Sequence, residues 1–260
     1  MSVTVRDVYT DNFSDVFTVC SGAAPSGYMA EGVEIKRRWL AWVTEELGPI
    51  SKVAYLDGKP VAQALFLPES AIPYEPNPRR GVVRLFCIYN SAPEARGKGA
   101  AGSLLASLID DCTNGIRCLR GESCSFIASE PFNTGEGISL SGFYGSRGFK
   151  QGAAEMYLEV NGRYTEPARA AACPQKADQG MAIALFNPTC EYSYSSARKA
   201  IDFITEVAPG TPTRVVDQWS EPQESIMRGG RWLTVNCVPI KASIREKDKL
   251  KAEVLGALEA

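Results

Sequence analysis

Apolar residues recur along the chain with the spacings of helices and strands. Between residues 31 and 47 they fall on one stripe of a helix, and a Gly-Pro pair follows as a stop signal. Residues 52–67 hold two apolar runs on either side of Asp57-Gly58, a pair typical of the turn in a β-hairpin. A helix followed by a hairpin is therefore predicted in the first quarter of the chain.

A strand, a glycine-rich turn and a helix are predicted next. The apolar run at residues 82–89 predicts a buried strand, the glycines at 96–102 follow it, and the amphipathic segment at 99–112 predicts a helix. In the rest of the chain up to residue 163, we expect a proline-rich loop at 68–80 and a short strand at 124–128. A loop with a short helix at 135–148 and another strand at 156–160 are predicted to follow.

The pattern changes at residues 164–179, which are rich in alanine and polar residues and show no clear period, so we expect a linker there. The order β-α-β-α-β-β-α follows, with elements predicted at 181–186, 194–207, 213–216, 221–228, 231–235, 238–244 and 246–258. We therefore predict a mixed α/β protein with one domain at 1–163 and a smaller α/β domain at 180–260.

Composition narrows the class of protein. The 260 residues are 45% hydrophobic and 22% charged, which suits a packed core with a soluble surface. The formal net charge of −2 provides no basic surface for nucleic acid. No apolar stretch approaches the roughly 20 residues that span a bilayer, and the N-terminus has no signal-peptide core. We expect a cytoplasmic protein that binds neither nucleic acid nor membrane.

The chemistry available to the chain is limited because it contains no histidine. The commonest general base and metal ligand in proteins is therefore absent. The eight cysteines form no C-x-x-C pair, which favours free thiols in a reducing compartment and predicts no metal site. Any catalysis would have to use carboxylates, tyrosine, cysteine, backbone groups or water.

The glycine-rich turn at 96–102 is the strongest candidate for a binding site. A turn that opens a helix leaves backbone N–H groups unpaired, and together with the helix dipole they favour a phosphate. Arg96 and Lys98 add positive charge, and the small residues around them let a ligand approach the backbone closely. A nucleotide-binding turn or a purely structural turn remains the alternative.

Three segments resemble the GCN5-related N-acetyltransferases. Residues 96–101, Arg-Gly-Lys-Gly-Ala-Ala, fit the family signature R-x-x-G-x-A, and residues 93–95 resemble its P-E-x element. Residues 143–149, Phe-Tyr-Gly-Ser-Arg-Gly-Phe, resemble its F-Y-x-x-x-G-F segment. The resemblance covers about residues 1–163 and implies a mixed sheet flanked by helices, with acetyl-coenzyme A as the donor substrate.

The resemblance also implies how the donor is held. Its pyrophosphate would rest on the amides of the glycine-rich turn, and its pantetheine arm would pair with the end of the preceding strand. The cofactor-binding residues expected on this basis are Ile88, Tyr89, Asn90, Arg96, Gly97, Lys98, Gly99, Ala100, Ala101 and Gly102.

The implied reaction is direct attack of a primary amine on the thioester. Tyr144 matches the family's general acid, and a phenol is protonated at neutral pH and can donate to the leaving thiolate. The base is expected to be a relay of water, with Glu130 as the first carboxylate candidate and Glu94 and Glu31 as others. Cys87, on the central strand, could instead carry the acetyl group, although buried cysteine more often fills core space. The expected acceptor is a small-molecule amine or a peptide amino group.

The C-terminal order of elements is that of the thioredoxin fold. The turn after its first strand holds Cys190 and Ser193 as C-x-x-S, and a cysteine at a helix N-terminus is expected to have a lowered pKa. An acetyltransferase with such a tail resembles the YoaP-type subgroup. The tail could carry a thiol site at Cys190, shape the substrate or hold a homodimer together. The alternatives to an acetyltransferase are a non-catalytic acyl-coenzyme A or thiol-binding module, and a thiol-dependent enzyme centred on Cys190.

Overall fold

The chain divides into two compact units. The structure is a computed structural model, and it describes residues 2–21, 24–90, 92–131, 139–168 and 175–260. The first unit comprises Met1–Ala24, Leu40–Ile72 and Asn77–Ala168. The second comprises Pro25–Trp39, Pro73–Pro76 and Arg169–Ala260.

The first unit is built on a seven-stranded mixed sheet with the order β1-β2-β3-β4-β5-β7-β6. The strands are β1 (Val3–Asp7), β2 (Ser51–Leu56), β3 (Lys59–Pro68), β4 (Val82–Asn90), β5 (Phe126–Ser129), β6 (Lys150–Gln151) and β7 (Met156–Glu159). All neighbouring pairs are antiparallel except β4 and β5, which are parallel. The mixed sheet flanked by helices confirms the predicted fold class.

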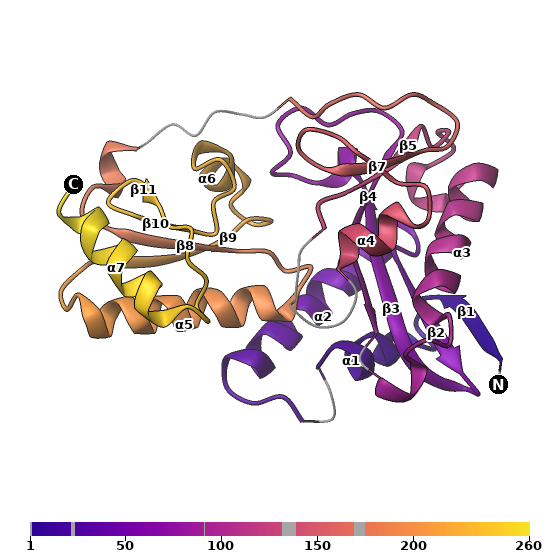
Figure 1. Cartoon of the computed structure of the whole chain (residues 1–260), viewed down its shortest axis with the longest axis horizontal. Helices are drawn as coiled ribbons and strands as arrows, with labels where there is room; N and C mark the ends of the chain where they lie inside the picture. The colour runs from indigo at the N-terminus through magenta and orange to yellow at the C-terminus, as the bar shows by residue number, and fades with distance from the viewer. Residues whose placement is uncertain (1, 22–23, 91, 132–138, 169–174) are drawn as a thin grey trace. The chain divides into compact units, whose positions relative to one another are not determined.

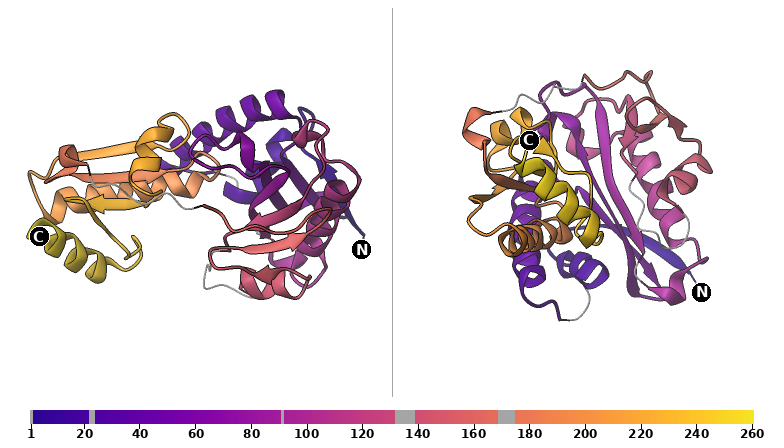
Figure 2. Two further views of the ribbon diagram at one scale, coloured as in Figure 1. Left: turned by 90° about the horizontal axis from the view of Figure 1, so that it is seen from above. Right: turned by 60° about the vertical axis from the view of Figure 1, so that its left-hand side comes forward.

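Two helices cover opposite faces of this sheet (Figures 1 and 2). Helix α3 (Ala100–Asn114) buries Leu104, Leu105, Leu108 and Cys112, whose spacing of three and four residues forms one apolar face. Helix α1 (Phe13–Ser21) lies against β3 and β4 on the other face. A short helix, α4 (Leu140–Gly145), precedes β6, and the 3₁₀ turns η1 (Glu69–Ala71), η2 (Pro93–Ala95) and η3 (Arg117–Leu119) connect elements of the sheet.

In the first unit, the long helices and strands were predicted from the sequence, whereas some of the short ones were not. The hairpin of β2 and β3 is present, and its turn residues Asp57 and Gly58 have φ of 48° and 81°, as a tight hairpin turn requires. The short elements β1, α1 and β6 were not predicted. These elements are too short to display a hydrophobic periodicity, and they are stabilised by contacts with the rest of the unit rather than by local sequence preference. Part of the predicted loop at 135–148 lies outside the described residues.

The second unit has a four-stranded sheet with the order β11-β10-β8-β9. Its elements are η4 (Lys176–Asp178), β8 (Ala182–Phe186), α5 (Glu191–Val207), β9 (Thr213–Asp217), α6 (Pro222–Met227), β10 (Leu233–Val235), β11 (Val238–Pro239) and α7 (Lys247–Leu258). Strands β8 and β9 are parallel, and β10 is antiparallel to both β8 and β11. The predicted order β-α-β-α-β-β-α is therefore present.

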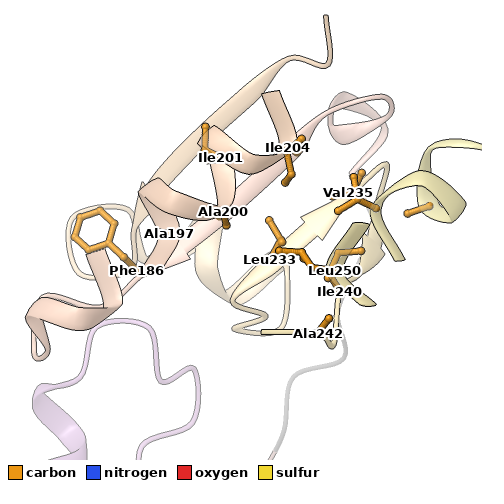
Figure 3. Packing of buried hydrophobic residues seen from close by; sticks show 14 residues of the cluster. Phe186, Ala197, Ala200, Ile201, Ile204, Leu233, Val235, Ile240, Ala242 and Leu250 are labelled. Atoms are coloured by element: carbon orange, nitrogen blue, oxygen red, sulfur yellow. The ribbon is translucent and has the colours of Figure 1, made fainter. Parts of the chain in front are cut away.

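The core of the second unit lies between its sheet and the helices α5 and α7 (Figure 3). Ile204, Leu233 and Leu250 are each fully buried there. Strand β11 is shorter than the predicted strand at 238–244, because only Val238 and Pro239 pair with β10. Ile240 still donates a 3.0 Å backbone hydrogen bond to the carbonyl of Leu233, whereas the Ala242 amide donates to the Glu253 carboxylate. Both side chains are buried in the core, so the apolar character of this segment reflects packing more than strand formation.

Helix α2 (Tyr28–Leu47) begins in the second unit and ends in the first. Within the second unit it packs closely on the start of α5: a Cβ added at Gly32 would lie 2.5 Å from the backbone oxygen of Glu191. The Lys36 ammonium lies 2.9 Å from the Glu191 carboxylate, and both side chains are almost fully buried. The division at residues 163 and 180 stays a prediction, and so does the linker, of which residues 169–174 lie outside the described part.

A membrane-spanning element was not found. Across the described residues, every helix is too short or too polar to cross a bilayer.

Candidate functional site

A gap between β4 and β5 is the central feature of the candidate site. The two strands pair only from Val82 to Arg84, whereas β4 continues to Asn90. The Ser129 hydroxyl, at the end of β5, donates a 2.9 Å hydrogen bond to the carbonyl of Leu85. A side-chain hydrogen bond thus follows the last backbone pair between the two strands, and beyond this point β4 pairs with β3 but not with β5.

The predicted cofactor-binding residues of β4 lie along this gap. Ile88, Tyr89 and Asn90 pair with β3 on their other side, and no pairing with β5 is present at these positions. The Ile88 side chain is buried, and Tyr89 and Asn90 are partly buried. The side of these residues that β5 does not pair with is suited to an extended ligand that carries amide groups.

The glycine-rich turn between β4 and α3 follows the 3₁₀ turn η2. Gly97 and Gly99 have φ of 72° and 86°, and Gly99 is the N-cap of α3. A Cβ at either position would meet no atom within 4 Å, so these glycines are needed for their left-handed backbone and not for space.

The turn presents a group of unpaired backbone donors. Lys98 N–H donates to the carbonyl of Ala95, and Ser103 N–H closes the first helical bond to Gly99. Within the described residues, no acceptor in the chain pairs with the amides of Gly97, Gly99, Ala100, Ala101 and Gly102. Unpaired amides at the start of a 15-residue helix favour an anionic group.

The positive side chains around the turn have no acidic partner. Arg96 and Lys98 are exposed, and among the described residues neither lies within ion-pair distance of a carboxylate. Other exposed cations of the first unit do find one: Arg80 pairs with Glu122 and Lys150 with Glu159. The charge at the turn is therefore available to a ligand.

Tyr144 on α4 has a buried hydroxyl without a partner. The side chain is completely buried, and its hydroxyl makes no hydrogen bond with the described residues. Burial raises the pKa of this phenol well above its usual value, the neighbouring Ser129 lowers it in part, and Cys87 raises it further. These neighbours belong to the end of β5 and to β4, so the hydroxyl lies where the two strands separate.

Cys87 is partly exposed on β4. Gln63, which is completely buried on β3, donates a 3.2 Å hydrogen bond to its sulfur through Nε2. An N–H donor of this kind holds the thiol in place, and the sequence did not predict Gln63.

Glu130, the first carboxylate candidate for the base, is exposed and paired with Arg84. Its Oε1 lies 3.3 Å from Nη1 of that guanidinium. The predicted role of Glu130 as base stays a prediction, now with a cation bound to its carboxylate. Glu31, another candidate, accepts a 2.7 Å hydrogen bond from Tyr194 in the second unit.

A buried charge network supports the start of β4. Glu69 and Glu155 are completely buried, and Arg79 lies 2.9 Å from the first and 2.6 Å from the second. Arg84 lies 3.0 Å from Glu69 and 3.3 Å from Glu155. Burial lowers the pKa of Arg79, but the hydrogen bonds to Glu155 and Glu69 outweigh it and the net shift is upward. Two guanidinium groups thus neutralise two carboxylates, and the sequence did not predict this arrangement.

Cys190 in the second unit corrects one expectation. It is the N-cap residue of α5, but its side chain does not cap the helix. Cys190 keeps an exposed surface, yet the protein around its thiol raises its pKa; the Lys36 ammonium opposes this effect and the Glu191 carboxylate adds to it. The expected lowering of its pKa by the helix is wrong, because desolvation is the larger effect.

The remaining cysteines provide neither a disulfide nor a metal site in the described part of the chain. Cys190 follows the end of β8, and Cys237 follows Val235, which pairs with the start of that strand. Several residues of strand, about 3.3 Å each, separate the two ends, and this exceeds the reach of a disulfide. Burial raises the pKa of Cys118 to about 12, and a hydrogen bond with Cys124 raises that of Cys112.

Comparisons with known proteins were made at the level of sequence and of structure. No protein-family model and no curated protein matches the chain. Among solved structures, the chain is similar to the ribosomal-protein-S18-alanine N-acetyltransferase from Escherichia coli, with 16% identity and a TM-score of 0.41 over 64% of this chain and 99% of that one.

Two further solved structures are similar to a comparable extent. PaiA N-acetyltransferase from Thermoplasma acidophilum, in complex with coenzyme A, has 14% identity and a TM-score of 0.41 over 62% of this chain and 99% of that one. A GNAT family acetyltransferase from Brucella melitensis, in complex with acetyl-CoA, has 18% identity and a TM-score of 0.40 over 64% of this chain and 94% of that one.

Proposed function

We propose that the chain is an acetyl-coenzyme A-dependent N-acetyltransferase whose site lies in its first unit. The observation that carries the proposal is a combination of three features: unpaired amides at the start of α3, an end of β4 that does not pair with β5, and a buried hydroxyl on Tyr144 without a partner among the described residues. The amides suit a diphosphate, the end of β4 suits a chain that carries amide groups, and the Tyr144 hydroxyl suits the sulfur of a thioester. The motifs at 96–101 and 143–149 independently resemble those of N-acetyltransferases.

In this proposal the backbone binds the donor. The N–H groups of Gly97, Gly99, Ala100 and Ala101 donate to the diphosphate, and the Arg96 and Lys98 side chains add positive charge. The side of β4 from Ile88 to Asn90 that does not pair with β5 binds the pantetheine amides, as a neighbouring strand would. The thioester would then lie near the point where β4 and β5 separate, beside Tyr144.

Tyr144 supplies the proton for the leaving group. Attack by a primary amine forms the C–N bond and breaks the C–S bond, and the thiolate must be protonated. The raised pKa of Tyr144 keeps the phenol protonated through the neutral and mildly alkaline range. The proton passes from the phenol to the sulfur as the C–S bond breaks, and the phenolate regains a proton from solvent.

The proton of the attacking amine leaves through water in this proposal. Glu130 remains the first candidate to receive it, since it is exposed beside the gap, and its pairing with Arg84 holds the carboxylate in a fixed place. The proposed acceptor is a small-molecule amine or a peptide amino group. No metal takes part in the proposed reaction.

The second unit is proposed to be a thioredoxin-like domain in a cytoplasmic protein of YoaP type. Its sheet order β11-β10-β8-β9 and its element order support that interpretation. The raised pKa of Cys190 weighs against a thiol-dependent enzyme centred on it, so shaping of the substrate or a homodimer contact is the proposed role.

Replacement of Tyr144 by phenylalanine tests the proposal. Loss of the general acid is expected to lower kcat for acetyl transfer by about 100-fold or more, with the affinity for coenzyme A unchanged, because the ring still packs. Rates come from a thiol-release assay with a panel of amines, and affinities from calorimetry.

Tyr9→Phe is the matched control, since Tyr9 is an exposed tyrosine of the same unit. Binding of coenzyme A without any acetyl transfer by the unaltered protein would favour a binding module. Activity that survives Tyr144→Phe but is lost in Cys190→Ser would favour the thiol-dependent enzyme.

A further inference from the structure

We infer that Arg147 is a third cation of the proposed phosphate site and that Gly102 is a glycine in order to make room for it. This inference rests on the proposed function and adds a specificity-determining residue to it. A Cβ added at Gly102 would lie 2.7 Å from Nη2 of Arg147. The guanidinium therefore lies directly against the first turn of α3, although Arg147 follows α4 in the chain.

Gly102 differs from the other glycines of the turn. It is a helical residue with an ordinary backbone, whereas Gly97 and Gly99 are left-handed. A glycine inside a helix destabilises it by about 1 kcal/mol relative to alanine. The space that its missing side chain leaves is filled by the Arg147 guanidinium, which explains the glycine physically.

Arg147 is positioned by neutral groups. Its guanidinium carbon lies 4.3 Å from the centre of the Phe143 ring, and Nη1 donates a 3.1 Å hydrogen bond to the Ser146 hydroxyl. In the described part of the chain, no carboxylate pairs with it. The charge is thus held against the first turn of α3 without being neutralised. Arg96 and Lys98, in the segment that precedes this helix, also have no acidic partner among the described residues.

A second observation on the same segment indicates a ligand. Tyr144, three residues before Arg147, carries the completely buried hydroxyl that has no partner. The segment around α4 therefore presents a proton donor toward the gap between the strands and a free cation toward the glycine-rich turn. A ligand with a thioester at one end and phosphates at the other satisfies both. Coenzyme A offers two phosphate groups for Arg147, its diphosphate and its 3′-phosphate.

The test compares three ligands on the full-length protein by calorimetry: coenzyme A, dephospho-coenzyme A, which lacks only the 3′-phosphate, and pantetheine, which has no phosphate. Arg147→Gln is expected to weaken coenzyme A binding about tenfold, because a charge-assisted hydrogen bond is lost. Pantetheine binding is expected to stay unchanged. If the penalty disappears with dephospho-coenzyme A, Arg147 binds the 3′-phosphate; if it persists, Arg147 binds the diphosphate.

Gly102→Ala provides a second route to the same result without removal of a charge. The new methyl group should displace the guanidinium and weaken coenzyme A binding in the unaltered background. In the Arg147→Gln background the same substitution should have no further effect, since nothing is left to displace. Lys150→Gln is the control, because it removes an exposed cation of the same unit that pairs with Glu159.

The outcomes separate this inference from the proposed function. The inference is overturned, while the proposed function stands, if Arg147→Gln binds coenzyme A as tightly as the unaltered protein. It is also overturned if the variant loses affinity for pantetheine by the same factor as for coenzyme A. If the unaltered protein binds neither coenzyme A nor pantetheine, the proposed function itself fails. Thermal unfolding of each variant identifies those that are merely unstable.

Discussion

At the scale of single residues, charge is either fully paired or left free. In the first unit Glu69 and Glu155 are buried and bound by Arg79 and Arg84. Arg96, Lys98 and Arg147, in contrast, have no acidic partner in the described part of the chain. Paired charges hold the scaffold together, and unpaired charges of one sign in one place favour a ligand of the other sign.

Arg79 and Arg80 are neighbours that provide a matched test of this difference. Arg79→Met leaves two buried carboxylates without their closest cation and is expected to lower the free energy of unfolding by about 3–5 kcal/mol. Arg80→Met removes an exposed pair with Glu122 and is expected to change it by less than about 1 kcal/mol. Denaturant unfolding measures both, and equal effects would contradict the assignment of stability to the buried network.

The left-handed glycines of the turn were predicted from the sequence, but the contacts of Arg147 with α3 and of Gln63 with β4 were not. A left-handed backbone conformation favours glycine, so the turn at Gly97 and Gly99 could be predicted from these residues alone. Arg147 and Gln63 act through contacts with residues far away in the chain, and no local period marks such contacts. Arg147 does lie inside the recognised segment 143–149, so its charge beside Tyr144 was the available signal.

At the scale of elements, helical glycines show how packing overrides propensity. Gly32 of α2 lies against the backbone of Glu191, and Gly256 of α7 has open space around its Cβ position. Both belong to helices of the second unit, so substitution by alanine has the same intrinsic benefit in each.

Alanine at these two positions is expected to act in opposite directions. Gly256→Ala should raise the free energy of unfolding by about 0.5–1 kcal/mol. Gly32→Ala should lower it by about 1–3 kcal/mol, because a backbone oxygen 2.5 Å away must move. The midpoints of thermal unfolding, measured in parallel, decide between this account and one based on propensity alone.

The long helices and strands were predicted from their hydrophobic patterns. Where a predicted end differs from the observed one, tertiary contacts account for the difference. Helix α5 begins at Glu191 rather than at 194, because its first turn is stabilised by Lys36 from α2. The strand predicted at 238–244 ends at Pro239, because the amides of Lys241 and Ala242 donate to the Glu253 carboxylate instead of to a neighbouring strand. Neither effect can be read from an isolated window of sequence.

At the scale of the whole molecule, residues far apart in the chain form one folded unit. Lys36 and Glu191 are separated by 155 positions and make a buried 2.9 Å ion pair within the second unit. The sequence suggested a C-terminal domain made only of residues 180–260. The pattern of α2 indicated a buried face but could not show which part of the chain it covers.

Loss of this ion pair should affect the whole second unit. Lys36→Met removes the ammonium group that pairs with the buried Glu191 carboxylate, and is expected to lower the free energy of unfolding by about 3–5 kcal/mol. The double variant Lys36→Met, Glu191→Met is expected to recover most of this loss, since no buried charge remains. A double variant as unstable as the single one, in denaturant unfolding, would show that the pair contributes packing and not charge compensation.

The glycine at position 102 has a practical consequence for protein engineering. A stabilisation campaign that ranks helical glycines by propensity would select positions 32, 102 and 256 alike. Their surroundings differ, with a carbonyl oxygen against the first, a guanidinium against the second and empty space beside the third. Only the last is a safe place to add a methyl group, because alanine at position 102 would gain helix propensity but displace the Arg147 guanidinium.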